Sequence, residues 1–373
     1  MPPETTRADV LGRLFTEGPA RSEWFAPGFL ARVPLAAVVS GMAALRQRHG
    51  DVREVNRASE GFIGRLARAN IPAQISLDGE GHVSGLVLQP AVPTGGPLQD
   101  YVQAIAGLPG RTAVLVVTDG VTRAAHAADA PLAVGSAFKL AVLHAAALAC
   151  DAGRLRWDQV VSFDPAWRSL PGGMLQDWPT GTPLTVGTLA ALMISISDNT
   201  AADAMLRITG QAAVEAVSPR NTPFLSTREA FILKGRTAGE LRRRWMVADA
   251  EGRRALLDAA AGLPLPDAAD LAREATLGVE WLFTAHELCA LLDATAHLPA
   301  LHINPGPAAG GGWQSVAYKG GSETGVYALS VLAVAPSGTR HCVIAIWNGE
   351  DALEEQRLLV PFGGMLGLLA NEG

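Results

Sequence analysis

Three short motifs in this sequence contain residue types that can form a nucleophilic site. The first is Ser136-Ala-Phe-Lys139, at the start of an apolar run that reads as a buried helix. Residues i and i+3 of a helix lie on one face. A serine hydroxyl is a weak nucleophile until a neighbouring base removes its proton, and a neutral lysine can be that base. Burial or nearby cations would lower the lysine pKa from its ordinary value of about 10.4.

The second motif is Ser197-Asp198-Asn199, which separates two helical patterns at 184–194 and 200–208. A polar tripeptide at such a junction is also typical of a plain turn with a helix N-cap. In a catalytic reading, Ser197 passes a proton to a leaving group and Asn199 binds a substrate amide. Asp198 would fix the loop.

The third motif is "YKGGSETG", from Tyr318 to Gly325, at the end of a predicted strand. Its glycines allow another group to approach the backbone closely. Lys319 would supply positive charge for a substrate carboxylate, and the backbone N–H of Ser322 would donate to an oxyanion. The alternative is a bulge or turn in an exposed strand.

Each motif alone has an ordinary structural explanation, including an N-cap serine at 136 and a lysine at 139 that extends to the surface. Their order and spacing favour chemistry. Ser197 follows Ser136 after 61 residues, and Lys319 follows Ser197 after 122 residues. Each motif falls at the structural junction that its role requires.

An S-x-x-K, S-D-N and K-T-G trio is typical of class A β-lactamases and penicillin-binding proteins. The segment 111–373 resembles that superfamily of active-site serine hydrolases. The resemblance implies an α+β fold, with an antiparallel sheet and a helical subdomain. It also implies an oxyanion hole formed by the amides of residues 136 and 322. The implied catalytic residues are Ser136, Lys139, Ser197 and Lys319, and the implied substrate-binding residues are Asn199, Gly321 and Ser322.

The sequence departs from that family at two places. The third motif reads Lys-Gly-Gly, so Gly320 lacks the hydroxyl that usually contacts the substrate carboxylate. The E-x-x-L-N pattern, whose Glu activates the deacylating water in efficient class A enzymes, is absent. The matching region, 221–235, contains one carboxylate, Glu229, which we interpret as a solvated residue at a helix start. We therefore expect acylation and slow deacylation.

The stretch "QPAVPTGGPLQD" (89–100) has the Pro and Gly content of a linker. It predicts a small α+β accessory domain at 1–92 and a hydrolase domain at 99–373. The first part contains a helical pattern at 29–51 and two strands around an Asp-Gly-Glu-Gly turn. It resembles a cystatin-like or NTF2-like domain, and the layout is similar to that of two-domain β-lactamase-like proteins of clavulanate biosynthetic clusters. Its acidic residues Asp51, Glu54 and Glu60 are interpreted as a solvated surface.

In the second part, a strand at 111–120 with a hairpin partner precedes helical patterns that extend from about 136 to 298. Strands return at 314–350, with turns near Gly320 and Ser337, and a closing helix follows. Strands at both ends of a domain indicate an antiparallel sheet completed by segments distant in sequence.

Composition excludes several classes of function. The net charge of −6 and the lack of a Lys/Arg run argue against nucleic-acid binding. The longest apolar stretch, at 140–150, is too short to cross a bilayer, and His144 interrupts it. The N-terminus lacks a basic segment followed by an apolar one, so we expect a cytoplasmic protein, or a secreted one if a leader has been removed.

The sequence contains no zinc, dinucleotide or Walker motif, and its eight histidines are scattered, so we expect no metal or cofactor. His144 and His286-Glu287 are interpreted as core or surface residues. The three cysteines, Cys150, Cys289 and Cys342, are far apart in apolar segments. Their odd number and wide spacing favour free buried thiols.

The favoured function is hydrolysis of β-lactams, small esters or related amides through an acyl-serine. Two alternatives stay open. One is a protein that binds or senses β-lactams with little turnover. The other is a D,D-peptidase, against which the missing export signal argues.

Overall fold

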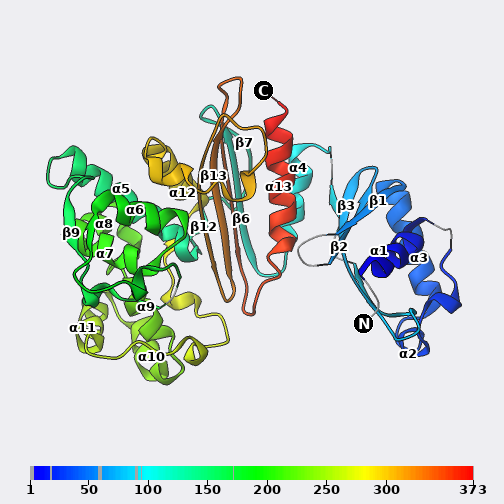
Figure 1. Cartoon of the computed structure of the whole chain (residues 1–373), viewed down its shortest axis with the longest axis horizontal. Coiled ribbons are helices and arrows are strands. Elements are labelled where there is room, and N and C mark those ends of the chain that lie inside the picture. The colour runs from blue at the N-terminus through cyan, green and yellow to red at the C-terminus, as the bar shows by residue number, and fades with distance from the viewer. Residues whose placement is uncertain are drawn as a thin grey trace. The chain divides into compact units, whose positions relative to one another are not determined.

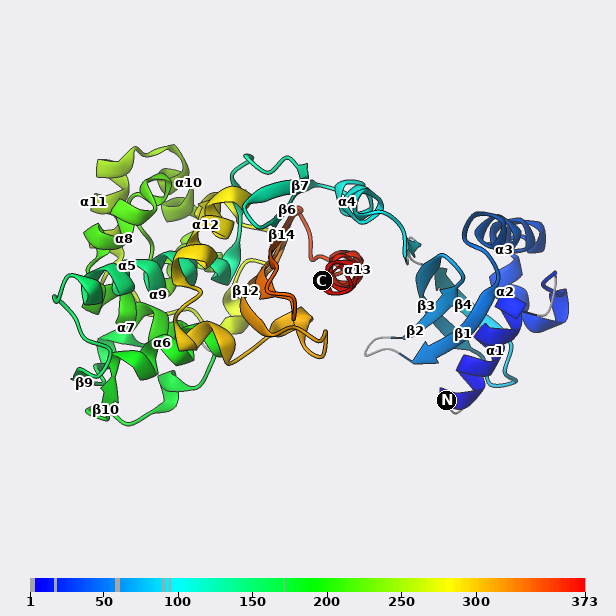
Figure 2. The same ribbon diagram turned by 90° about the horizontal axis from the view of Figure 1, so that it is seen from above.

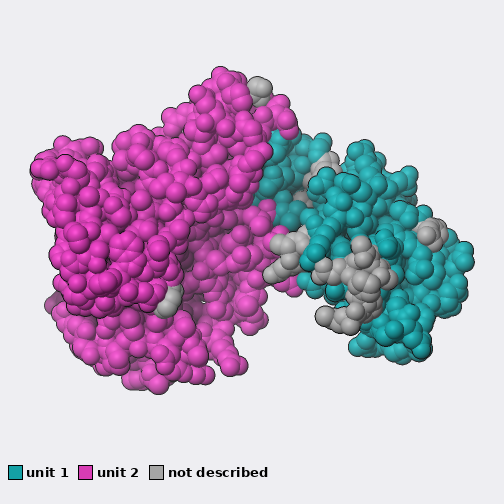
Figure 3. Space-filling model, in the orientation of Figure 1, with its two compact units in different colours: residues 1–104, 360–368 teal, residues 105–359, 369–373 magenta. Residues whose placement is uncertain are grey.

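A computed structural model of the chain describes residues 4–16, 19–57, 61–88, 91–93, 95–170 and 172–372. It divides into two compact units, which Figure 3 shows in different colours. Unit 1 comprises residues 1–104 and 360–368, and unit 2 comprises 105–359 and 369–373. The division passes through two helices, α4 (Leu98–Ala106) and α13 (Gln356–Ala370).

Unit 1 is a small α+β unit, as the sequence predicts. Its antiparallel sheet has the order β1-β2-β3-β4, and a short fifth strand also pairs with β3. Apolar side chains of α1, among them Leu11 and Leu14, are fully buried and share one core with the alternating inward residues of β3. The elements are α1 (Glu4–Thr16), α2 (Pro27–Leu30), α3 (Leu35–His49), β1 (Val52–Arg57), β2 (Phe62–Leu66), β3 (Ala69–Leu77), β4 (Val83–Leu88) and β5 (Val92–Pro93).

The predicted linker is partly structured. Its residues 92–93 form β5, and α4 begins at Leu98, while residues 89, 90 and 94 lie outside the described part of the chain. Of the three acidic residues predicted to be solvated, Asp51 and Glu54 are exposed, and Glu60 lies outside the described residues. The predicted domain limits, 92 and 99, and the likeness to cystatin-like or NTF2-like domains remain proposals.

Unit 2 contains an antiparallel sheet whose strands come from both ends of the segment, as predicted (Figure 1). The order is β12-β13-β14-β6-β7, so the pairing of β14 with β6 joins residues more than 200 positions apart. Nearly every side chain of β13 and β14 is buried, so both faces of these central strands are covered. The strands are β6 (Arg111–Thr118), β7 (Val121–His126), β12 (Ser315–Glu323), β13 (Val326–Val334) and β14 (Arg340–Asn348).

Between β7 and β12 the chain forms a block of helices. In space this helical block lies beside the sheet (Figures 1 and 2). At its centre is α5, whose alanines and leucines are buried almost all round. A helix that is apolar on every side must be surrounded by protein, and α7, α8 and α12 pack against it. The helices are α5 (Lys139–Asp151), α6 (Val186–Ser195), α7 (Asn199–Thr209), α8 (Gln211–Val217), α9 (Thr227–Lys234), α10 (Gly239–Val247), α11 (Ala250–Ala260) and α12 (Ala285–Thr295).

One predicted turn is wrong. Gly320 lies inside β12, and the chain reverses at Thr324-Gly325, where Gly325 has a φ of +73°. The glycine pair therefore does not end the strand. The turn near Ser337 is confirmed, as is the closing helix, α13.

The prediction of three free thiols is also wrong. Cys289 of α12 and Cys342 of β14 form a disulfide with their Cα atoms 6.1 Å apart. Their sequence separation of 53 residues hides this pairing, which arises because α12 packs on the sheet beside β14. Only Cys150 is free.

None of the helices in the described part of the chain is long and apolar enough to span a membrane. Within the same residues, no group of three or more His, Cys, Asp or Glu side chains is arranged to hold a metal ion.

The disulfide predicts a thiol count. Alkylation of the denatured protein without reductant should modify one cysteine, Cys150, whereas alkylation after reduction should modify three. Reduction should also lower the free energy of unfolding by up to about 4 kcal/mol, because the bond closes a long loop. Intact mass spectrometry gives the count, and denaturant titration gives the stability. Three alkylated cysteines without reductant would contradict the pairing.

Candidate active site

Ser136 lies in a 3₁₀ turn, Gly135–Phe138, that leads directly into α5. The turn follows β8 (Leu132–Ala133), and its first residue, Gly135, has a φ of +48°. The alternative explanation for Ser136, an N-cap serine, is wrong, because neither this turn nor α5 has a side-chain N-cap. Its hydroxyl is therefore not used to start a helix.

Hydrogen bonds on both edges hold β8, the short strand that precedes Ser136. The side-chain amide of Asn348, at the end of β14, accepts from the Ala133 N–H at 2.8 Å and donates to the Ala133 carbonyl at 2.9 Å. On its other edge, β8 pairs with β11 (Leu282–Phe283). In addition, the ring of Trp281 stacks on Phe138 with centroids 3.8 Å apart.

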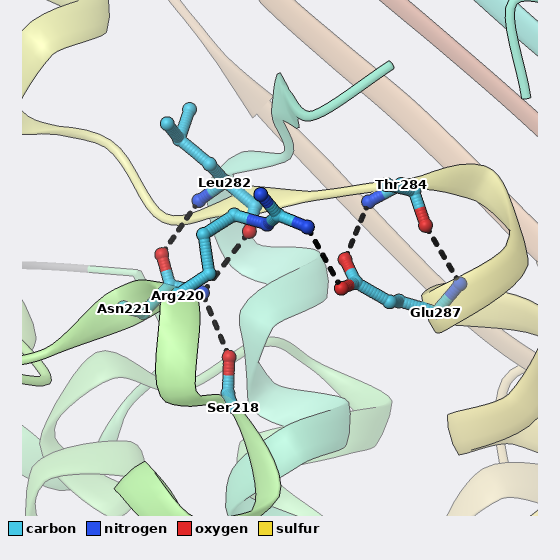
Figure 4. Close-up of polar contacts among 6 residues, drawn as sticks. All are labelled: Ser218, Arg220, Asn221, Leu282, Thr284 and Glu287. Atoms are coloured by element: carbon cyan, nitrogen blue, oxygen red, sulfur yellow. Dashed lines mark hydrogen bonds and ion pairs between the residues drawn. The ribbon is translucent and has the colours of Figure 1, made fainter. Parts of the chain in front are cut away.

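The strand β11 is in turn tied to the helical block (Figure 4). Asn221 accepts from the Leu282 N–H at 2.8 Å, and its side-chain N–H donates to the Leu282 carbonyl at 3.0 Å. Close by, Thr284 and Glu287 form a capping box at the start of α12, and Glu287 also pairs with Arg220. Asn348 and β11 thus position the segment that contains the nucleophile, and Asn221 in turn positions β11.

Lys139 is fully buried, and its ammonium group has three acceptors. They are the Ser197 carbonyl at 2.5 Å, the Ser197 hydroxyl at 3.1 Å and Asn199 Oδ1 at 2.8 Å. This explains how a lysine is accommodated in an apolar helix, because a buried charge is costly unless it is bonded. The alternative of a lysine extended to the surface is wrong.

Ser197 occupies a backbone conformation that a non-glycine residue seldom adopts, with a φ of +59°. Its hydroxyl lies between two amines, 3.1 Å from Lys139 Nζ and 3.0 Å from Lys319 Nζ. Strained backbone of this kind persists only where its surroundings enforce it, and it is enriched at active sites. The second motif therefore brings the first and third together.

The two lysines affect each other's protonation. Burial lowers the pKa of Lys139 to about 7, although Asp198, Asp203 and Glu323 oppose the shift. Burial and the neighbouring Lys139 lower the pKa of Lys319 well below its ordinary value. Two buried ammonium groups that share one hydroxyl repel each other, so the pair titrates as a unit and one member is readily neutral.

Asp198 fixes the loop, as predicted. Its carboxylate accepts from the backbone N–H groups of Met174, Leu175 and Ala201, and the last of these contacts caps α7. Asn199 is buried at the first position of α7, where its side-chain oxygen accepts from Lys139.

The third motif approaches the nucleophile through its backbone. A Cβ atom on Gly321 would lie 2.1 Å from the Val134 carbonyl oxygen and 2.6 Å from the Ser136 nitrogen. Glycine is therefore required where β12 passes the 3₁₀ turn. A Cβ on Gly135 would lie 3.4 Å from the Ser322 nitrogen. These contacts place the amides of residues 136 and 322 close to each other, as an oxyanion hole requires.

A cavity of about 600 Å³ opens beside these groups. Six of the seven predicted site residues line it, and the seventh, Lys139, lies behind Ser197 and Asn199. The six are Ser136, Ser197, Asn199, Lys319, Gly321 and Ser322. The structure thus brings the whole predicted set to one place.

Glu229 does not belong to this cavity. Its carboxylate accepts from the backbone N–H and the hydroxyl of Ser226, both at 2.7 Å, in a capping box that begins α9. Phe231, of the same helix, and Leu271 line the cavity instead. The side of the cavity formed by the helical block is therefore apolar at these positions.

Sequence reasoning missed a buried charge cluster beside the cavity. The ammonium of Lys234, at the end of α9, pairs with the carboxylates of Glu280 and Glu323. Burial raises the pKa of Glu280 to about 7. Burial also acts to lower the pKa of Lys234, but the carboxylates of Glu280 and Glu323 outweigh it, so the pKa of Lys234 is raised. Glu323 also lines the cavity. A lysine in the last turn of a helix reads as an ordinary surface residue, so no sequence signal marks this cluster.

The close approach at Gly321 leads to a prediction. Gly321→Ala should slow acylation by about 100-fold or more, because the methyl group would displace one oxyanion donor. It should also cost about 1–3 kcal/mol of stability through overpacking. Stopped-flow acylation and urea unfolding test both effects. The matched control is Gly363→Ala in α13, where a Cβ meets nothing within 4 Å. Unchanged acylation in Gly321→Ala would contradict this placement.

Comparison with known proteins gives a family match over part of the chain and a likeness of fold. A family model described as "Beta-lactamase enzyme family" matches residues 97–227, which contain the first two motifs. A search of curated proteins found no match. Three solved structures with the same fold have TM-scores of 0.51, and the alignments cover 74% of this chain.

These structures are a β-lactamase from Sphaerobacter thermophilus DSM 20745, an ancestral class A β-lactamase and a β-lactamase from Xanthomonas campestris pv. campestris str. ATCC 33913. Their sequence identities are 20%, 17% and 15%, and 96%, 100% and 96% of their respective chains are covered. Residues 97–227 thus match the family model of β-lactamase enzymes, and the aligned 74% of the chain has the fold of class A β-lactamases.

Proposed function

We propose that unit 2 hydrolyses β-lactams or small esters through an acyl-Ser136 intermediate. The observation that carries the proposal is the single hydroxyl of Ser197 held between Lys139 and Lys319 at the edge of the cavity that contains Ser136. A buried lysine with a pKa near 7 is suited to general base catalysis at neutral pH.

In the acylation step, the Ser136 oxygen attacks the substrate carbonyl and its proton passes to neutral Lys139. The amides of residues 136 and 322 stabilise the oxyanion. The proton then reaches the leaving nitrogen or oxygen through Ser197, and the C–N or C–O bond breaks. Lys319 binds a substrate carboxylate, and Asn199 orients both Lys139 and the acyl side chain.

Deacylation is proposed to be slow. It requires a water molecule and a base of its own. Glu229 is bound in a helix cap, and the only carboxylate among the described residues that line the cavity is Glu323, which is paired with Lys234. The same observation favours a second candidate, a protein that binds β-lactams covalently and releases them hardly at all.

The proposed function predicts burst kinetics, with fast formation of the acyl-enzyme and slow release. Mixing with a penicillin should give about one equivalent of acyl-Ser136 followed by slow release, and a small ester should turn over faster because its acyl group leaves more room for water. Ser136→Ala should abolish the adduct, and Lys139→Ala should slow acylation by about 100- to 10,000-fold. Glu229→Gln is the control and should change deacylation less than threefold. Intact mass spectrometry and stopped-flow kinetics measure these steps.

Undiminished labelling of Ser136→Ala would contradict the nucleophile assignment. Fast penicillin turnover without a burst, lost in Glu229→Gln, would show that this residue supports deacylation after all. A stable adduct with no measurable release of any substrate would favour the binding or sensing function.

A second prediction concerns pH. The base must be neutral, so the rate of acylation by a small ester without a carboxylate, which does not need a protonated Lys319, should rise about tenfold per pH unit below about 7 and level off above it, because burial lowers the Lys139 pKa to about 7. Lys139→Arg retains a cation that does not deprotonate, so its residual acylation should lose this inflection. Single-turnover acylation rates from pH 5 to 9 test this. A rate that falls with rising pH would contradict a lysine base.

A further inference from the structure

The missing hydroxyl of the third motif has a structural explanation. Residues i and i+2 of a strand share one face, so Tyr318 and Gly320 are neighbours on β12. A Cβ atom on Gly320 would lie 2.2 Å from the phenol oxygen of Tyr318 and 3.0 Å from its Cζ. The phenol therefore occupies the space into which a threonine or serine at position 320 would extend, and only glycine fits beside it.

The tyrosine ring is held in this position from a second side. Gly306 has a φ of +53°, and a Cβ there would lie 2.4 Å from both Cδ1 and Cε1 of Tyr318. Two glycines from distant parts of the chain thus leave room for one ring. The ring cannot move toward either backbone, so the position of its hydroxyl is well defined.

The phenol is available to a ligand. Tyr318, Lys319 and Gly320 all line the cavity. The hydroxyl has no hydrogen-bonding partner among the described residues, and burial raises the Tyr318 pKa to about 12, so it remains an O–H donor at neutral pH. Lys319 donates to the Ser197 hydroxyl and to the Gly320 carbonyl, which leaves a third N–H when it is protonated.

Two carboxylates lie near these donors. Glu323 pairs with Lys234, whereas Glu355 accepts from the neutral Ser322 hydroxyl, and its negative charge contributes to the raised pKa of Tyr318. A phenol O–H and an amine are the donors that face the cavity beside these groups. Donors without an acceptor at the edge of a cavity fit an anionic ligand, and the planar carboxylate of a substrate can accept from both.

We propose that Tyr318 supplies, from two residues upstream, the hydroxyl that the Lys-Gly-Gly motif lacks, and that it selects substrates carrying a carboxylate next to the scissile bond. This inference rests on the proposed function. The pair Tyr318–Gly320 then replaces the Thr or Ser of the third motif, with Tyr318 as the specificity-determining residue.

The test uses two aryl esters of phenylacetic acid, one with a carboxylate on the leaving phenyl ring and one without. Tyr318→Phe should slow Ser136 acylation by the carboxylate ester about 10- to 100-fold, the usual effect of losing a hydrogen bond to a charged group. Acylation by the neutral ester should change less than threefold. Because the ring remains, this variant should keep the wild-type stability, which thermal unfolding checks.

Transfer of the hydroxyl provides a second arm. Tyr318→Val makes room for a side chain at 320. The double variant Tyr318→Val/Gly320→Thr should therefore prefer the carboxylate ester over the neutral ester at least tenfold more strongly than Tyr318→Val does. Gly320→Thr alone should be impaired with both esters, because its side chain meets the phenol. Tyr327→Phe tests the other tyrosine that lines the cavity.

The outcomes separate this inference from the proposed function. No acyl-Ser136 from either ester or from a penicillin would overturn the function itself. Acylation of Ser136 with an ester preference that is unchanged in Tyr318→Phe, or absent in the wild type, would overturn only the role of Tyr318. A larger loss of preference in Tyr327→Phe than in Tyr318→Phe would assign the donor to Tyr327 and also overturn the inference.

Discussion

The Ser197 hydroxyl shared by two buried lysines is the interaction on which the rest of the site depends. Removing two amines from water is costly, and they repel each other when both are protonated. The structure offsets this with acceptors on Ser197, Asn199 and Gly320. The same burial lowers the Lys139 pKa into the range of a useful base. Desolvation is therefore both the main cost of this site and the source of its reactivity.

The backbone of β12 provides the second constraint. Gly321 lets the strand contact the 3₁₀ turn of Ser136, and Gly320 admits the phenol of Tyr318. Both glycines are explained by what lies against them rather than by a turn. An edge strand can approach the nucleophile in this way because its outer side has no partner strand among the described residues, and the sheet order leaves β12 at the edge.

Charge is distributed unevenly around the cavity. The Lys234 cluster contains two carboxylates and one ammonium, and one of the carboxylates, Glu323, lines the cavity. The helical side presents the apolar Phe231 and Leu271 beside the polar Ser195, Ser197 and Asn199. None of these five residues has a carboxylate that could act as the base for a hydrolytic water. This asymmetry agrees with a site that acylates more readily than it deacylates.

The sequence by itself determined the three motifs, their order and the class of fold, because residue type and spacing are local properties that periodicity and glycine positions reveal. It also indicated that Lys139 requires polar partners. Only the tertiary structure decided which partners these are, that Cys289 meets Cys342, that Lys234 pairs with Glu280 and Glu323, and that Tyr318 occupies the space beside Gly320. Each of these contacts joins elements or faces whose distance is set by packing, and no local pattern records it.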